Sequence, residues 1–257
     1  MTPALLPPRE DTAAARAEGL QRPSQVARSA NQLLAALPHD EYLRLAPHLV
    51  RVRLVREQVL IERGQAAEHV YFIESGLALV ITAATASSSP LLVAMIGREA
   101  AVGCLALLDP AAAAAAAVVM LIAGTAWRMP VATLTRILGE SPAVRALVLR
   151  SVAALTRQVM QIAACNATAT VPQRYAQWLL MAHARLDGDD IAITHEMVSS
   201  ILGVRRSAVT ITAAALQRQG LVRTSRGRVT VLDRSGLEAL VDMGGPSGAT
   251  QRLDREG

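Results

Sequence analysis

The fold of this chain is most constrained by residues 193–233, ITHEMVSSILGVRRSAVTITAAALQRQGLVRTSRGRVTVLD. Apolar residues recur at helical spacing on both sides of Gly203, a residue that tolerates the positive φ of a tight turn between two helices. We expect a first short helix capped by Thr194 and a second from about Arg206 to Arg218. The residues that follow predict a two-stranded hairpin turning at Arg226–Gly227. The stretch therefore predicts a helix-turn-helix unit with a wing.

Positive charge is concentrated in the same part of the chain. All 26 basic residues are arginine, and seven of them lie between residues 205 and 234, where Asp233 is the one acid. The local charge of about +6 exceeds the net charge of +5 of the whole chain. Clustered arginines on one small unit are typical of a surface that binds phosphates, so we expect double-stranded DNA as a partner. The alternative is an arginine-rich, solvated helix pair without a role in DNA binding.

The start of the second helix carries the residues expected to read DNA, because a recognition helix places its N-terminal residues against base edges in the major groove. Arginine can donate a bidentate pair of hydrogen bonds to guanine. The buried face is expected to hold Val209, Ala213 and Leu216, with Ile211 at the edge of the exposed face. The predicted DNA-contacting residues are Thr194, His195, Arg205, Arg206, Ser207, Thr210, Arg226 and Arg228.

The region from about Asn31 to Pro130 predicts a short helical segment, broken at Pro38 and Pro47, followed by an antiparallel β-roll. The expected strands are RVRLV, VLIE, HVYFIE, LALVIT, LLVAMI and VVMLIAGTAWRM, separated by turn residues such as Gly64, Gly76, Gly97 and Gly124. Residues 110–127 are uncharged and long enough for a membrane helix, but seven are alanine, so the drive to insert is weak. We expect no membrane partner.

A long helix is expected between the roll and the helix-turn-helix unit. VATLTRIL forms a connector that should stop at Gly139; Ser141 is then a good N-cap, Pro142 suits the first helical position, and nothing breaks the helix before Asn166. One apolar set comprises Val144, Val148, Ser151, Leu155, Gln158, Ile162 and Cys165. A second set comprises Leu149, Val152, Val159 and Ala163. Two apolar faces need two partners, and the roll and a second copy of the same helix would supply them. A single face in a monomer core is the alternative.

The sequence therefore predicts an α+β chain: an antiparallel β-roll, a long helix and a C-terminal winged helix-turn-helix. The expected divisions are a disordered tail (1–28), the roll (29–132), the connector and dimerisation helix (133–166), the DNA-binding domain (168–241) and a second disordered tail (242–257). Cys104 and Cys165 lie far apart and match no metal-ligand spacing, which favours a reducing, cytoplasmic setting. The N-terminal residues do not resemble a secretory signal. No catalytic or phosphate-cradling arrangement is evident, so we expect no enzyme.

Two stretches resemble the cyclic AMP receptor/fumarate-nitrate regulator (Crp/Fnr) family of bacterial transcription factors. They are ACNATATVPQRYAQWLLMAHARL and ILGVRRSAVTITAAALQRQGLVRTSRGRVTVLDRSGLEAL, within a resemblance that covers about residues 31–240. The resemblance implies a homodimer, paired through the 142–166 helix, whose two recognition helices bind a near-palindromic site. Arg206 matches the family's main base-reading arginine, whereas Ser207 stands where many members carry a glutamate. Thr194 and His195 match phosphate-contacting positions. RNA polymerase is a further expected partner if the chain activates transcription.

The resemblance extends to the family's cyclic-nucleotide pocket only in part. The expected effector region holds Gly97, Glu99, Gly103 and Cys104, with Glu99 one residue late for the family's usual glutamate. Where the family has an Arg-Ser pair that binds the cyclic phosphate, this chain has the alanine run 111–117. A buried phosphate without a countercharge costs several kcal/mol, so we expect no cyclic-nucleotide binding.

Other sensors remain open as minor alternatives. An iron–sulfur cluster would need N-terminal cysteines that this chain lacks, and haem binding through His48 or His69 would rest on lone histidines. Redox sensing by Cys104 would need its thiol to ionise. Of the residues near it in the sequence, we expect only Arg98 and Glu99 to shift the pKa of this thiol. We therefore expect no cofactor, and a roll that takes an apolar effector or serves only as a dimerisation scaffold. The competing functional hypothesis is a cyclic-nucleotide- or small-molecule-responsive module that acts through protein partners.

Overall fold

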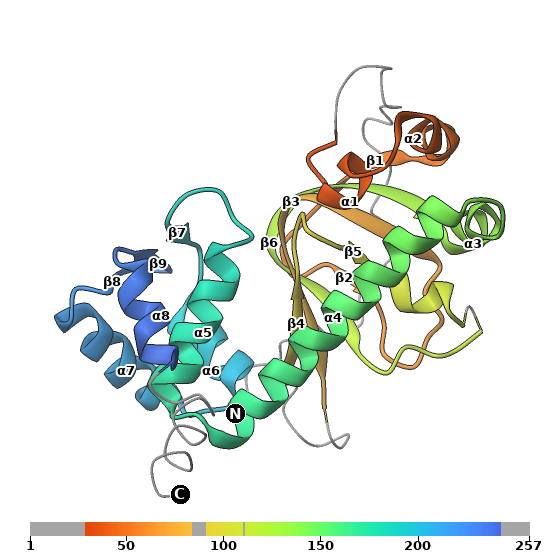
Figure 1. Cartoon of the computed structure of the whole chain (residues 1–257). Coiled ribbons are helices and arrows are strands. Elements are labelled where there is room, and N and C mark those ends of the chain that lie inside the picture. The colour runs from red at the N-terminus through yellow and green to blue at the C-terminus, as the bar shows by residue number, and fades with distance from the viewer. Residues whose placement is uncertain (1–28, 84–90, 110, 243–257) are drawn as a thin grey trace, which may run out of the picture. The chain divides into compact units, whose positions relative to one another are not determined.

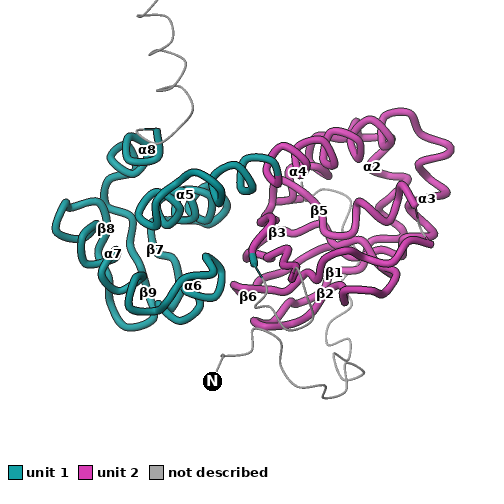
Figure 2. Tube along the Cα trace, turned by 90° about the horizontal axis from the view of Figure 1, so that it is seen from below, with its two compact units in different colours: residues 1–3, 85–91, 160–257 teal, residues 4–84, 92–159 magenta. Residues whose placement is uncertain are grey.

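The computed structural model describes residues 29–83, 91–109 and 111–242 (Figure 1). The chain divides into two compact units, one of residues 4–84 and 92–159 and the other of residues 1–3, 85–91 and 160–257 (Figure 2). The expected tail over 1–28, and all of the expected tail over 242–257 except Asp242, lie outside the described residues.

The first unit is built on a six-stranded sheet whose central ribbon pairs two long strands, β3 and β6. The strands are β1 (Val50–Leu54), β2 (Val59–Ile61), β3 (His69–Thr82), β4 (Leu91–Ile96), β5 (Ala101–Val102) and β6 (Ala117–Pro130). The sheet runs β1-β6-β3-β4, while β2 also pairs with β6 and β5 also pairs with β3. The registered pairs of β1, β2, β3 and β5 are antiparallel, as expected.

The sequence divided β3 into two strands at Gly76, and this prediction is wrong. The strand continues through Gly76, which has a φ of +88°, and its register with β6 shifts between Ile73 and Ala78. Across the ribbon, a Cβ on Gly124 would lie 1.9 Å from the carbonyl oxygen of Ser75. The two glycines therefore permit an irregularity that bends one long ribbon, rather than a turn that ends a strand.

Short helices pack beside the sheet. They are α1 (Gln32–Ala35), α2 (His39–Leu45), the 3-10 helices η2 (Ala46–His48) and η3 (Cys104–Leu107), and α3 (Val131–Glu140). The breaks at Pro38 and Pro47 fall where the prolines predict them, but α3 continues through Gly139 by one residue. The buried Asn31 side chain accepts hydrogen bonds from Leu33 N and Leu34 N, and donates to the carbonyls of Ile73 and Ala100. One side chain therefore caps α1 and ties it to the sheet.

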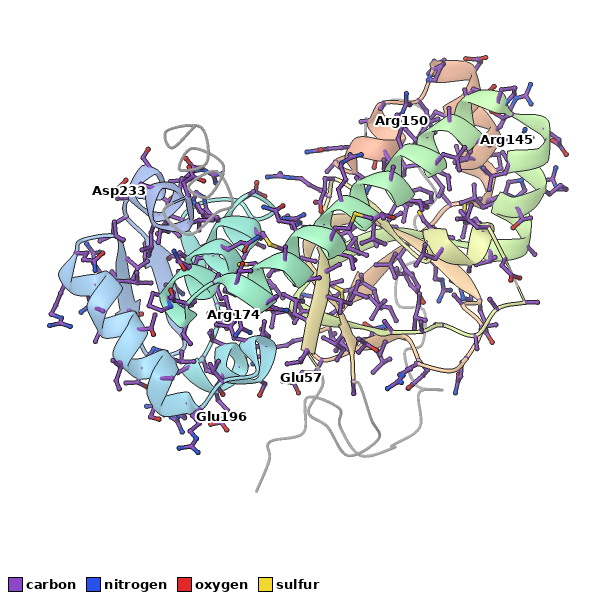
Figure 3. The ribbon with its side chains drawn as sticks, turned by 60° about the horizontal axis from the view of Figure 1, so that its bottom comes forward. Glu57, Arg145, Arg150, Arg174, Glu196 and Asp233 are labelled. Carbon is purple, nitrogen blue, oxygen red and sulfur yellow. The ribbon has the colours of Figure 1, made fainter. Side chains whose placement is uncertain are left out.

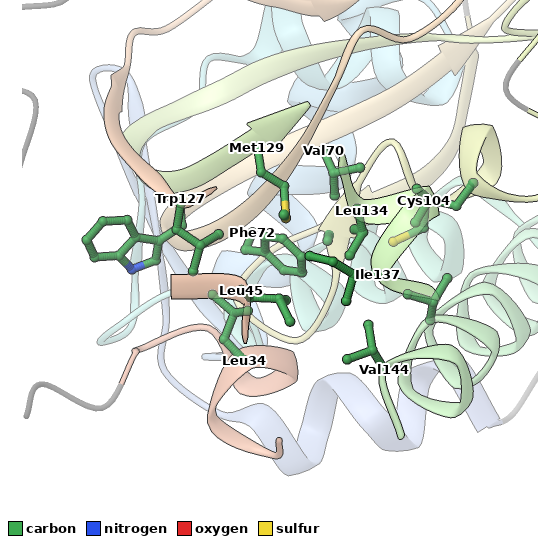
Figure 4. Close-up of a cluster of buried hydrophobic side chains, with 14 of the residues drawn as sticks. Leu34, Leu45, Val70, Phe72, Cys104, Trp127, Met129, Leu134, Ile137 and Val144 are labelled. Carbon is green, nitrogen blue, oxygen red and sulfur yellow. The ribbon is translucent and has the colours of Figure 1, made fainter. Parts of the chain in front are cut away.

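Two apolar clusters form the core of this unit. The first lies between the sheet and the helices (Figure 4) and includes Leu34, Leu45, Val70, Phe72, Cys104, Trp127, Met129, Leu134, Ile137 and Val144. The second fills the inside of the roll and includes Leu54, Ile61, Ile73, Ala78, Ile96, Val102, Val118, Met120 and Ala126. Alternate residues of β3 and β6 supply both clusters, as the two-residue period of a strand requires.

The long helix α4 (Pro142–Thr168) starts at the predicted Ser141 cap, whose hydroxyl accepts a hydrogen bond from Val144 N at 3.1 Å. Val144, Val148 and Ser151 are buried, as the first apolar set predicts. The second set is only partly right, because Val152 packs against the first core cluster. The outward face is instead a row of exposed residues at alternating spacings of three and four, the α4 seam: Ala146, Leu149, Ala153, Thr156, Met160, Ala163 and Ala167.

The second unit surrounds a three-stranded sheet of order β7-β9-β8 with helices (Figure 1). Its elements are α5 (Val171–His183), β7 (Asp190–Ile191), α6 (His195–Leu202), α7 (Arg206–Arg218), β8 (Val222–Ser225), β9 (Arg228–Val231) and α8 (Arg234–Asp242). Tyr175 and Trp178 of α5 are buried at its centre. The two helices and the hairpin lie at the residues that the 193–233 pattern predicts.

The described part of the stretch considered as a membrane segment, residues 111–127, contributes to a loop and to β6. Among the described residues, no helix combines the length and the apolar character that a membrane crossing requires.

Candidate nucleic-acid interface and effector region

The turn between α6 and α7 has the geometry that the sequence predicts. The hydroxyl of Thr194 caps α6 by accepting a hydrogen bond from Met197 N at 3.3 Å. Gly203 ends that helix with a φ of +62°, and Val204 N then donates to the carbonyl of Ser199 at 3.0 Å. A residue with a Cβ is strained in this left-handed conformation, so glycine fixes the angle at which α7 leaves α6.

Helix α7 has one buried face and one exposed face. Val209, Ala213 and Leu216 are buried as predicted, and Thr212 is buried with them. The exposed face carries Arg206, Ser207, Thr210, Ile211 and Ala214. The helix therefore packs through its apolar side and presents two short polar side chains, one arginine and one large aliphatic side chain to solvent.

Side chains of α6 and α7 contact each other along this exposed face. Arg206 forms an ion pair with Glu196 at 3.2 Å, where Glu196 lies beside α7 (Figure 3). His195 Nδ1 lies 3.2 Å from the hydroxyl of Thr210, which also donates to the carbonyl of Arg206 at 3.1 Å. Sequence reasoning placed His195, Arg206 and Thr210 at the surface but missed Glu196, because a single acid at a helix start is also an ordinary response to the helix dipole.

Arg174 of α5 contacts the end of α6 and so helps to fix the α6–α7 pair. Its guanidinium donates to the carbonyl of Leu202, at the end of α6, and to the side chain of Asn166 at 3.1 Å. A cation beside the last carbonyls of a helix also interacts favourably with the helix dipole. No local sequence pattern signals this contact, since Arg174 and Leu202 are 28 positions apart.

The wing is a tight hairpin of β8 and β9. Gly227 has a φ of +73°, and Arg226 is exposed beside it at the tip. Arg228 forms an ion pair with Asp190 of β7 at 2.5 Å, and Thr230 donates to the same carboxylate at 2.6 Å. The hydrogen bond from Thr230, followed by that from Arg228, lowers the pKa of Asp190. Arg228 thus anchors the wing to β7 in addition to facing solvent.

All seven arginines of residues 205–234 are exposed: Arg205, Arg206, Arg218, Arg223, Arg226, Arg228 and Arg234. Arg205 precedes α7 at its N-cap, and Arg206 and Ser207 open the helix. Backbone N–H groups at a helix start and exposed guanidinium groups are both donors suited to phosphate oxygens. The predicted DNA-contacting residues therefore lie on the start of α6, the start of α7 and the wing, and their individual roles stay predictions.

The loop between β4 and β5 holds the first two predicted effector residues. Gly97 is buried, and its backbone N–H donates to the carboxylate of Glu99 at 3.2 Å. The carbonyl of Arg98 accepts a hydrogen bond from Gln32 N at 2.7 Å. Glu99 therefore uses at least one carboxylate oxygen to close its own loop.

Gly103 and Cys104 follow β5 and begin the 3-10 helix η3. Gly103 has a φ of +92°, and a Cβ there would lie 2.7 Å from the carbonyl oxygen of His69. The Cys104 side chain packs in the first core cluster. Burial raises the pKa of the Cys104 thiol to about 11, against a smaller opposing effect of its hydrogen bond with Ser151. This thiol is protonated at neutral pH and has the surroundings of a packing residue.

The alanine run is joined to the loop at Gly64 and Gln65 by backbone hydrogen bonds. Ala114 N donates to the carbonyl of Gln65 at 2.9 Å, and the carbonyl of Ala114 accepts from Gly64 N at 2.8 Å. The methyl group of Ala114 packs against the roll-interior cluster, as do Tyr71 and Leu155. Helix α4 is tied to β4 here, because Met95 N donates to the side chain of Gln158 at 3.0 Å.

One cationic side chain does lie beside the roll interior. Arg128 of β6 faces Tyr71 of β3 in register, and the two side chains share a hydrogen bond. Burial raises the pKa of Tyr71, and Arg128 opposes that shift. Arg128 belongs to the expected strand VVMLIAGTAWRM, but no sequence pattern signals this pairing. In the parts of the chain that the structure describes, no group of three or more His, Cys, Asp or Glu residues could hold a metal ion.

Two family models match the chain. Residues 51–141 match the cyclic nucleotide-binding domain, and residues 173–240 match the Crp-like helix-turn-helix domain. The first match covers the sheet, and the second covers the helix-turn-helix unit with its wing and α8. A sequence comparison with curated proteins finds no match.

Solved structures share the fold at low sequence identity. A candidate transcriptional regulator of the Crp/Fnr family from Eubacterium rectale is 18% identical, with a TM-score of 0.64 over 83% of this chain and 99% of its own. FixK2 from Bradyrhizobium japonicum is 16% identical, with a TM-score of 0.65 over 75% and 96%. A CRP-family transcriptional regulator from Thermus thermophilus is 23% identical, with a TM-score of 0.60 over 74% and 96%. With both domain models in the family's order, the chain belongs to the Crp/Fnr family of transcription regulators.

Proposed function

We propose that this chain is a homodimer that reads a near-palindromic DNA site with two copies of α7. The observation that carries the proposal is the exposed start of α7, where Arg206 and Ser207 project from a helix whose other face is buried. Arg206 would donate to guanine in the major groove, and Ser207 and Thr210 would lie beside it. Thr194, His195, Arg205, Arg226 and Arg228 would contact phosphates and set the register.

The α4 seam supports the homodimer. Its seven residues keep the 3-4 alternation of a heptad pattern over six turns of helix, and Leu149 and Met160 are 50% and 66% exposed. The remaining members are alanine or threonine, which allow two helices to approach closely. A row of small and apolar residues of this length facing water favours pairing with a second copy of the same helix.

The roll is proposed to act without a cyclic nucleotide. By the resemblance, the alanine run 111–117 stands where the family has its Arg-Ser pair, and Ala114 of that run packs against the roll-interior cluster. The sequence holds no arginine between Arg98 and Arg128. Leu155 and Gln158 already join α4 to the roll through packing and a hydrogen bond. These contacts support a scaffold role, or an apolar effector, in place of an anionic ligand.

The first test is to select bound sites from random duplex DNA and then to measure affinities for the selected site. We expect Arg206→Ala to weaken specific binding by about 1–3 kcal/mol and to relax the base preference at one position of each half-site. Arg136→Ala is the matched control, because Arg136 is an exposed, ion-paired arginine on α3 of the other unit. Unchanged specific binding and base preference in Arg206→Ala would show that another residue reads the base.

A module that acts through protein partners is the competing function, and salt dependence separates the two. Phosphate contacts release counterions, so log K for DNA should fall steeply as log salt rises. A module that does not bind DNA would show no such dependence. Bacterial DNA lies in the cytoplasm, so the proposed function includes a cytoplasmic location. If the chain activates transcription, the proposal also includes contact with RNA polymerase.

A further inference from the structure

Ile211 is the most exposed large hydrophobic side chain among the described residues, with 69% of its surface accessible. Large aliphatic side chains are exposed singly on many proteins, so exposure alone carries no function. The position of Ile211 on α7 is what gives its exposure a meaning.

The helical spacing puts Ile211 on the surface expected to face DNA. It follows Ser207 by four residues and Arg206 by five, and one turn of helix further on lies the exposed Ala214. Val209, Ala213 and Leu216 fill the opposite, buried face. A helix that enters the major groove with Arg206 and Ser207 foremost therefore brings Ile211 into the groove as well.

The neighbours of Ile211 make this part of the surface apolar. The hydroxyl of Thr210 is already engaged within the protein, since it donates to the carbonyl of Arg206 and lies near His195. The exposed Ala214 adds a methyl group. The ion-paired Arg206 lies at the other edge of the exposed face.

Among the four bases, one presents a methyl group on its major-groove edge. This base is thymine, whose 5-methyl group projects into the groove. An isoleucine pressed against a donor or acceptor would remove its water without replacing the hydrogen bond, whereas contact with the methyl group removes apolar surface from water on both sides.

We propose that Ile211 reads the 5-methyl group of one thymine in each half-site, and so sets a base preference separate from that of Arg206. This inference rests on the proposed function. It assigns the specificity to an aliphatic contact, and it predicts that the methyl group itself, and not the hydrogen-bonding edge of the base, is recognised.

The test uses the full-length protein and its selected site, with thymines replaced one at a time by deoxyuridine. This replacement removes only the methyl group and keeps every hydrogen-bonding atom. We expect the unaltered protein to lose about fourfold in affinity at one thymine per half-site, the change typical of one buried methyl group. Ile211→Ala should bind more weakly and show no further loss with deoxyuridine, while Ile211→Val should keep part of the discrimination.

Leu232→Ala is the matched control, because Leu232 is a 48% exposed leucine in the same unit that lies after the wing. It should keep the full deoxyuridine effect. Equal thermal midpoints for the variants would show that folding is unchanged. The inference is overturned if no thymine is sensitive, or if Ile211→Ala keeps the same sensitivity. A chain that selects no site overturns the proposed function together with it, whereas a chain that binds its site but ignores the methyl group overturns this inference alone.

Discussion

At the residue scale, the side chain expected to read bases is also an ion-pair partner within the protein. Glu196 contacts Arg206 at 3.2 Å, and the Arg206 and Glu196 side chains are 69% and 43% exposed. A pair this exposed contributes little to stability. Its effect is on geometry and charge, because the carboxylate restrains the guanidinium and also places a negative charge on the surface proposed to contact DNA phosphates.

Replacing Glu196 with glutamine is expected to separate these two effects. Loss of the negative charge should strengthen non-specific DNA binding, whereas loss of the restraint on Arg206 should lower the ratio of specific to non-specific affinity by about threefold to tenfold. Fluorescence anisotropy with the selected site and with a scrambled duplex, at two salt concentrations, measures both. Glu238→Gln removes a similarly exposed carboxylate paired with Arg234 on α8 and should leave the ratio unchanged. An unchanged ratio in Glu196→Gln would show that Glu196 does not orient Arg206.

The buried Cys104 predicts a loss of stability at alkaline pH. Its pKa is about 11 in the folded chain against an ordinary value of 9.0, so between these values the unfolded chain releases a proton that the folded chain keeps. Stability from this group is fully present below pH 9 and is lost as pH rises toward 11. At pH 10 the loss amounts to about 1 kcal/mol.

Urea unfolding at pH 8 and pH 10 should show this difference in the transition of the unit that contains Cys104. The Cys104→Ala variant should lose about 1 kcal/mol less than the unaltered chain between the two pH values. The same burial predicts that thiol reagents modify the partly exposed Cys165 before Cys104. Rapid modification of Cys104 in the folded protein would revive the redox-sensor alternative.

At the scale of the elements, the sequence predicted helix and strand bounds best where the hydrophobic period and the capping or turn residues indicate the same boundary. The bounds of α6, the Gly203 turn, the end of α7 and the wing were predictable because each has a local cause: the Thr194 cap, or the positive φ of Gly203, Gly220 or Gly227. The continuous β3 was not, because Gly76 indicates a turn unless its cross-strand neighbour Gly124 is known. Contacts such as Arg174 to Leu202, or Arg128 to Tyr71, join distant positions and left no local pattern.

Helix α4 yields a prediction of its own. Met160→Glu places a charge in the α4 seam and should shift the protein from dimer to monomer, because two carboxylates would face each other across the paired helices. Specific DNA affinity should fall by at least about tenfold, since one half-site is then bound at a time. Sedimentation and anisotropy measure the two effects. Gln161→Glu introduces the same charge at the next exposed residue, off the seam, and should change neither. A dimeric Met160→Glu would place the interface elsewhere.

At the scale of the whole molecule, the DNA-binding end and the roll differ in the charge that each offers to a phosphate. Cyclic AMP or cyclic GMP at about 1 mM should change the affinity for the selected site by less than about twofold, because the alanine run 111–117 proposed to replace the family's phosphate-binding pair carries no countercharge. Anisotropy with and without nucleotide, and calorimetric titration of the nucleotide alone, check this. A tenfold rise in DNA affinity would mean that another cation, with Arg128 the first to examine, serves the phosphate.

The central claim is that two copies of α7 read two half-sites together. Its most direct measurement compares the affinity of the full-length protein for the selected site with that for the same site carrying five extra base pairs between its half-sites. Five base pairs rotate one half-site to the opposite side of the duplex, about half a helical turn away. A dimer should lose at least about a hundredfold in affinity, down to the level of a single half-site. Undiminished binding after this insertion would contradict the claim.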